Sequence, residues 1–416
     1  MRMSQWFPIA ALSTFVAIAG CTVDDGTNPD AHPQDSGVKR DTKPPEVSDA
    51  GSLQPFNPPP SDPGVRAILF SASGEALALG GYAFPPASKG DPVFVDGWQI
   101  EFTRLLVTLD KLTLSENPDK VPTDPSTTDE PIAEVEGPWA IDLHQGGSLA
   151  GKGGGDERAV PLVSMTGKTA GGALDPTRRY AFGFDVVKAS ATAMNVNLDA
   201  AALADYQDMI SKGYSVLYVG TATFKGGASC TSPSSTYEFS KLPRVVHFRL
   251  GFKSPATYVN CQNPDNDPAT AFGGEEHQRG IQVKDNTFVV AQVTVHTDHP
   301  FWESVLHDSP AHFDMIAARH WGADTADAVL EDLIGVDVTK ITDSRGVAVP
   351  FRSCTPSYTP RSGAMSFDPQ SIPVDPSKPP SQAFRDLYDF STYNQSTQGH
   401  LNSDGLCYVR RHYPAP

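Results

Sequence analysis

The sequence has few basic residues, few cysteines and no apolar run long enough to span a membrane. Its 416 residues include 32 Lys and Arg against 49 Asp and Glu, which gives a formal net charge of −17. Because binding to a phosphate backbone needs a basic surface, this excess of acids argues against a nucleic-acid-binding protein. Beyond residue 20, no apolar run approaches the roughly 20 residues that a transmembrane helix needs.

The cysteines exclude several kinds of site. The chain has five, and none forms a Cys-x-x-Cys pair of the kind found in structural zinc sites and thioredoxin-like redox sites. Apart from Cys21 they form an even set, Cys230, Cys261, Cys354 and Cys407, which predicts two disulfides in an exported protein and leaves no thiol as a nucleophile. Of the three pairings, we favour Cys230–Cys261 with Cys354–Cys407, because each closes a shorter loop.

The first 21 residues have the pattern of an export signal. The apolar run 7–20 is about 14 residues long, too short for a membrane span but typical of a signal peptide. Residues 18–21 read Ile-Ala-Gly-Cys, which resembles the lipobox of bacterial lipoproteins. This resemblance implies removal of residues 1–20 and acylation of Cys21. Thr22, in place of Asp, then favours the outer membrane. The alternative is an ordinary secretory signal with a chance cysteine.

The rest of the chain divides into a tether and one large domain. Residues 21–64 are rich in Pro and Asp and almost lack large apolar side chains, so burial could not offset the cost of ordering them. We therefore expect a disordered tether, followed by a single β-rich domain at 65–416. A Pro- and Ser-rich segment, 353–416, is expected to wrap this domain and to be held by its cysteines.

Strand patterns predominate in the domain. The chain contains 35 Gly and 37 Pro, which favour turns and strands over long helices. The runs with period-two character are 67–70, 98–102, 105–109, 180–187, 214–224, 245–252 and 287–297. They predict a mainly β fold, an antiparallel sandwich or a barrel-like domain. Helices are predicted only at 198–211 and within 301–336, where Ser309 and Thr325 look like helix caps.

Four of the 11 histidines lie between positions 296 and 312, together with several acids. The candidate metal ligands of this segment are His296, Asp298, His299, Glu303, His307 and His312. Strand alternation through 287–297 places Gln292, Thr294 and His296 on one face. If the chain then turns helical, residues 299, 303 and 307 share a stripe at a spacing of four.

Imidazoles together with carboxylates are the ligands of a divalent transition metal, so the segment predicts a zinc or copper site. The alternative is that these residues cap helices or form ion pairs. His247 and His277 are reserve ligands. His144, His320, His400 and His412 are expected to be surface or capping residues.

The segment Thr294-x-His296-x-Asp298-His299 resembles the His-x-His-x-Asp-His signature of metallo-β-lactamase-like hydrolases, with threonine in the first histidine position. That resemblance implies metal ligation and a hydrolytic site.

The sequence favours a lipid-anchored envelope protein that binds zinc or copper, without singling out catalytic residues. The alternatives are a surface module that binds a glycan or protein partner, with aromatics such as Trp98, Trp139 and Tyr358 in the binding face, and a metal-dependent hydrolase. The expected partners are the membrane, through the anchor, and an envelope polymer or protein.

Overall fold

The structure is a computed structural model that describes residues 53–234, 236–266, 273, 275–306, 309–367 and 386–413. The predicted signal peptide, Cys21 and most of the predicted tether lie outside the described residues, as does His307. Within the described ranges, no helix is both long and apolar enough to span a membrane.

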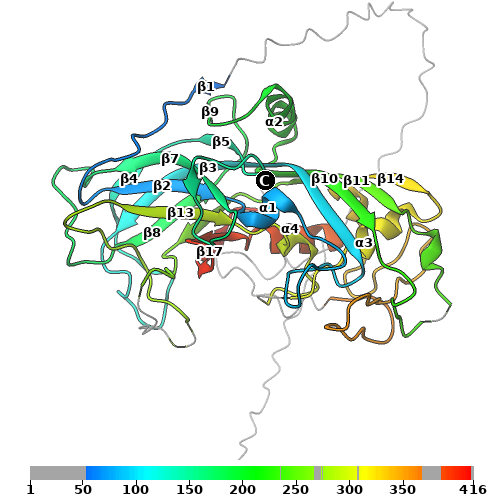
Figure 1. Cartoon of the computed structure of the whole chain (residues 1–416). Coiled ribbons are helices and arrows are strands. Elements are labelled where there is room, and N and C mark those ends of the chain that lie inside the picture. The colour runs from blue at the N-terminus through cyan, green and yellow to red at the C-terminus, as the bar shows by residue number, and fades with distance from the viewer. Residues whose placement is uncertain are drawn as a thin grey trace, which may run out of the picture. The chain divides into compact units, whose positions relative to one another are not determined.

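The larger of two sheets has eleven strands (Figure 1). Their bounds are β1 (Gln54–Pro55), β3 (Trp98–Ser115), β4 (Pro131–Val135), β5 (Trp139–Asp142), β8 (Ala181–Val186), β9 (Met194–Asn195), β10 (Val216–Phe224), β11 (Val245–Phe252), β12 (Ala256–Val259), β14 (Thr325–Val329) and β17 (Tyr408–Arg411). The main path runs β1-β9-β5-β3-β10-β11-β14. The remaining strands join it through the C-terminal half of β3, which pairs with β4 and β8.

The smaller sheet contains β13 (Val289–Val295), the strand that leads into the histidine-rich segment 296–312, near its middle. Its order is β16 (Gly405–Leu406), β15 (Gly399–Leu401), β13, β2 (Ile68–Ser73), β7 (Arg158–Met165) and β6 (Leu149–Ala150). β13 lies between β15, which is antiparallel to it, and β2, which is parallel. Both edges of β13 are therefore paired, which positions the residues at its end.

The prediction of a mainly β fold is confirmed, and the two sheets form a sandwich-like body rather than a closed barrel. The sheets are mixed rather than purely antiparallel, because β2–β13 and β11–β14 are parallel pairs. Each of these pairs joins strands separated by other elements of the fold, and such long connections allow parallel pairing.

Aromatic side chains form much of the core. The ring centroids of Phe70 and Phe182 lie 5.5 Å apart, and those of Phe184 and Tyr258 lie 4.5 Å apart. A second apolar cluster forms where α2 (Ala200–Lys212) packs on β3, β5 and β10. Figure 1 shows α2 beside β5 and β9. The helix predicted at 198–211 is thus confirmed, and Asp199 caps it by accepting from the Ala202 amide.

The other helical elements are short. They are α1 (Glu75–Gly80), η1 (Phe239–Lys241), η2 (His299–Phe301), α3 (Asp314–Ala317), η3 (Ala318–His320), η4 (Leu330–Leu333) and α4 (Leu387–Gln395). The prediction of helices through 301–336 is wrong in part, because Thr325 begins β14 instead of capping a helix. β14 pairs with β11, so a long-range ladder replaces the local helix that the caps suggested.

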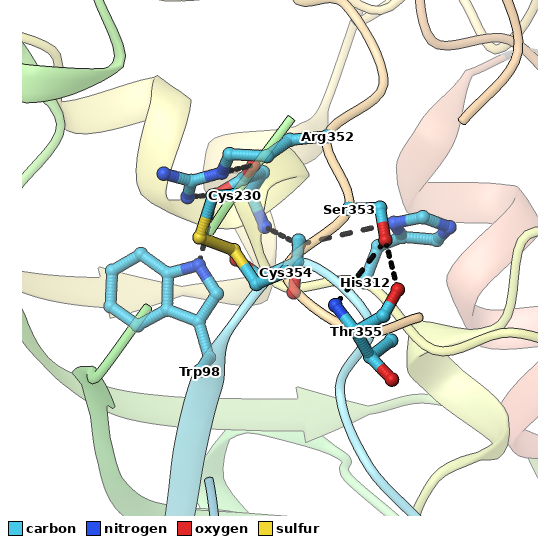
Figure 2. Close-up of a disulfide and its surroundings, with 9 residues drawn as sticks. Trp98, Cys230, His312, Arg352, Ser353, Cys354 and Thr355 are labelled. Atoms are coloured by element: carbon cyan, nitrogen blue, oxygen red, sulfur yellow. Dashed lines mark hydrogen bonds and ion pairs between the residues drawn. A yellow bond between two sulfur atoms is a disulfide. The ribbon is translucent and has the colours of Figure 1, made fainter. Parts of the chain in front are cut away.

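The favoured disulfide pairing is also wrong. The bonds join Cys230 to Cys354 and Cys261 to Cys407, across 124 and 146 residues. Backbone pairing brings these cysteines together: the Thr231 amide donates to Ser353 next to the first bond. Figure 2 shows the Cys230–Cys354 bond beside Trp98 and Arg352. Each disulfide ties the C-terminal segment to the body.

Candidate metal centre

Three imidazoles converge at one end of β13. His296, His299 and His400 each offer a ring nitrogen, and these three atoms lie within 4.8 Å of one another. The centroids of the His296 and His400 rings are 4.1 Å apart, and the His299 centroid is 5.4 Å from the first and 5.5 Å from the second. His299 and His400 are buried, at 1% and 0% exposure.

Strand register explains how two of the rings meet. His400 lies on β15 directly opposite Thr294, and His296 is two residues beyond Thr294 on the same face. The two histidines are therefore diagonal cross-strand neighbours, a relation that brings long side chains into contact. After β13, the Phe301 amide donates to the Asp298 carbonyl and closes the turn that forms η2. This turn brings the His299 ring toward the rings of His296 and His400.

The predicted alternation of β13 is confirmed, and its polar face is buried. Gln292 and Thr294 are both 0% exposed. The Gln292 amide Nε2 donates to Glu157 Oε1 at 2.6 Å, and the Ser403 backbone amide donates to Thr294 Oγ1 at 2.9 Å. Buried polar groups are costly without partners, and both bonds supply them. The Ser403 bond also holds the β15–β16 turn against the strand beside the histidines.

The tautomer of His299 follows from its neighbours. The Thr397 hydroxyl donates to the Asn394 carbonyl at 2.7 Å, so its oxygen accepts from His299 Nδ1 at 2.7 Å. The proton of the neutral ring is therefore on Nδ1, and Nε2 carries the lone pair that a metal needs. In known sites, hydrogen bonds of this kind to the nitrogen that does not touch the metal orient the metal-binding histidine.

Two carboxylates form a second group around His296. Glu75, His296 and Asp404 also offer ligand atoms within 4.8 Å of one another. Glu75 Oε1 lies 3.5 Å from His296 Nε2 and accepts from the Ser403 hydroxyl at 2.7 Å. Burial tends to raise the pKa of Glu75, but His296 and Ser403 outweigh it and lower that pKa. Burial tends to lower the pKa of His296, but the neighbouring Glu75 carboxylate outweighs it, so that pKa is raised overall.

Asp298 lies beside the centre but belongs to neither group of ligand atoms among the described residues. Burial raises the pKa of its carboxyl, although the charge of His296 and a hydrogen bond from Trp302 oppose this. Trp302 also stacks on the His299 ring with 3.8 Å between centroids. Asp298 is therefore part of the surroundings of the site.

Glu303 and His312 form a separate pair. His312 Nε2 donates to Glu303 Oε2 at 2.8 Å, and the same oxygen accepts from the Tyr358 hydroxyl at 2.8 Å. His312 lies opposite Phe301 because the chain reverses between these residues, with the His312 amide donating to the Phe301 carbonyl. The helical turn that would align residues 299 and 303 does not form, since η2 ends at Phe301 and residues 302–306 are not helical. This reversal removes the expected stripe of ligands.

Three residues of the centre were missed by the sequence reasoning. His400, expected at the surface, is fully buried, and neither Glu75 nor Asp404 was considered. All three lie about 100 or more residues from His296 along the chain, so no local spacing could reveal them. The reserve ligand His247 is exposed and bonded to Thr221 Oγ1 at 3.1 Å.

The hydrolase-like signature is incomplete in the structure as well. Thr294 stands in the position of the first histidine, and its hydroxyl oxygen accepts from the Ser403 amide and from Gln292 Nε2, the latter at 3.0 Å. The chain matches no protein-family model, no curated protein sequence and no solved structure. The centre therefore has to be interpreted from its own chemistry.

Proposed function

We propose that the protein binds one divalent transition-metal ion, zinc or copper, through His296, His299 and His400. The observation that carries this proposal is the convergence of three imidazole nitrogens within 4.8 Å. Zinc–imidazole bonds are about 2.0–2.1 Å long, so small side-chain movements would bring the three nitrogens into a tetrahedral shell. In a neutral His299 ring, the hydrogen bond to Thr397 keeps the proton on Nδ1 and leaves Nε2 as the nitrogen for a metal.

The donor set also selects among metals. The four cysteines of the domain are in disulfides, so no thiolate is present at the centre. Three imidazoles flanked by carboxylates suit Zn²⁺ or Cu²⁺, whereas Cu⁺ prefers sulfur ligands. A divalent ion held mainly by imidazoles is therefore the occupant that the chemistry favours.

Metal content tests the proposal directly. The purified chain, loaded with Zn²⁺ and dialysed, is expected to retain about one zinc per chain by elemental analysis, because three imidazoles bind zinc more tightly than a single surface histidine. A His299→Ala variant is expected to lose this zinc, and a His247→Ala variant, which removes an exposed imidazole, is expected to keep it. Zinc-free wild-type chain, or equal zinc in His299→Ala, would contradict the proposal.

We further propose that the protein is anchored to the cell envelope by acylated Cys21, in the outer membrane. The lipobox-like residues 18–21 and the Pro- and Asp-rich tether support this proposal. Cys21→Ser is expected to move the protein from the membrane fraction to the soluble fraction and to abolish its labelling by radioactive palmitate, because no acyl chain remains to insert in the bilayer. Unchanged fractionation and labelling would show that Cys21 is not the anchor.

A glycan- or protein-binding role receives less support. Two of the three aromatics suggested for such a surface, Trp98 and Trp139, are buried at 0% and 1% exposure. The Trp98 indole donates to Asp314 Oδ1 at 2.9 Å inside the core. These tryptophans therefore stabilise the fold and do not form a binding face.

A further inference from the structure

We propose that Glu75, His296 and Asp404 form an outer cation station through which the metal ion enters the three-histidine site. This inference rests on the proposed metal-binding function. It assigns to Glu75 and Asp404 a role in capture of the ion, while His299 and His400 hold it.

Exposure to solvent increases from the three-histidine group to the group formed by Glu75, His296 and Asp404. His299 and His400 are buried, whereas the side chains of His296 and Glu75 are 11% and 20% exposed. Asp404 is exposed. An ion arriving from solvent would therefore meet the carboxylates before it could reach the inner imidazoles.

The two carboxylates are held on the solvent side of His296 by the same turn. Asp404 lies in the turn between β15 and β16, and the preceding residue, Ser403, donates to Glu75 Oε1. The backbone amide of Ser403 donates a hydrogen bond to Thr294 Oγ1, which fixes the position of Ser403. The turn thus connects the outer carboxylates to the strand that carries His296.

The chemistry of the two groups suits an ordered entry. A hydrated divalent ion can bind exposed carboxylate oxygens while it keeps most of its water, but a buried imidazole site requires that water to leave. His296 belongs to both groups, so it can remain a ligand while the oxygens of Glu75 and Asp404 are exchanged for the nitrogens of His299 and His400. Because His296 is shared, we expect one ion at a time.

The rate of zinc binding tests this route. Zn²⁺ is mixed with the metal-free full chain in a stopped-flow instrument, with a chromophoric zinc indicator as the reporter. Because negative charge at an entrance raises the on-rate of a cation, we expect the Glu75→Gln, Asp404→Asn double variant to bind about 10-fold more slowly at low salt. The difference is expected to shrink at about 1 M salt. The stoichiometry should stay at one zinc per chain.

Asp327→Asn serves as the control. It removes one negative charge from an exposed position on the edge strand β14, so its on-rate is expected to match that of the wild type. If circular dichroism shows that Glu75→Gln disturbs the fold, the single variant at exposed Asp404 decides the matter, with an expected slowing of several-fold.

Each outcome separates the two proposals. An unchanged on-rate in the folded carboxylate variants, with one zinc still bound, would overturn the outer station and leave the metal-binding function intact. Two zinc ions per wild-type chain would overturn the shared, single-ion arrangement. A wild-type chain that binds no zinc would overturn both.

Discussion

Replacing His400 by alanine is expected to weaken zinc binding by more than 100-fold. His400 contributes one of three converging nitrogens and is fully buried. Loss of a direct ligand should exceed the roughly 10–100-fold effect of losing a residue that only hydrogen-bonds to a ligand in known metal sites. Calorimetric titration of the full chain against a competing chelator would measure the dissociation constant.

Thr397→Val is the graded comparison for this experiment. Valine keeps the shape of the side chain but cannot accept from His299 Nδ1, so zinc affinity is expected to fall by about 10–100-fold through misorientation of that ring. His247→Ala, at an exposed position, should leave the affinity unchanged. The three-histidine centre would be refuted by a His400→Ala variant with wild-type affinity, or by equal losses in all three variants.

Replacing Arg352 by alanine is expected to destabilise the fold by about 3–5 kcal/mol, the usual cost of breaking a buried ion pair from one side. The Arg352 guanidinium forms two hydrogen bonds to the Asp314 carboxylate, with Nε to Oδ2 at 2.9 Å. Asp314 is 0% exposed, and the guanidinium also lies over the Phe224 ring, 4.2 Å from its centroid. Its position next to the Cys230–Cys354 bond is visible in Figure 2.

A neighbouring acid gives this loss a pH dependence. Burial and the charge of Asp314 raise the pKa of Asp96 to about 7. Because its pKa is higher in the folded state than in the unfolded chain, Asp96 takes up a proton on folding, and its contribution to stability decreases as pH rises from about 4 through 7. Arg352 is among the groups that lower this pKa, so in the variant Asp96 stays protonated to a higher pH and the fold loses more stability between pH 5 and pH 8. The destabilisation should therefore be larger at pH 8 than at pH 5.

Urea unfolding of the wild type and of the variant at both pH values measures this difference. Lys120→Ala is the matched control, since the Lys120–Asp129 pair is also close, at 2.6 Å, but its side chains are 44% and 31% exposed. Exposed pairs contribute about 0–1 kcal/mol, so this variant should unfold near the wild-type midpoint. An Arg352→Ala effect as small as that of Lys120→Ala would show that the buried pair does not stabilise the fold.

Much of the fold could be predicted from local patterns in the sequence. The alternating runs at 245–252 and 287–297 correspond to β11 and β13, because alternation reports a strand with one buried face whichever strand pairs with it. The same locality explains why His296 and His299 were identified: they lie together at the end of one strand. Where partners decide the structure, as in the segment that forms β14, the prediction of a helix was wrong.

The sequence by itself determined the acidic character and the β-rich class, and it identified two of the three histidines of the centre. Only the tertiary structure decided the third histidine, the flanking carboxylates and the disulfide partners. The physical reason is that β15 pairs with β13 from a position about 100 residues away, and the register of that pairing sets which side chains face His296. Spacing along the chain contains no information about such a register.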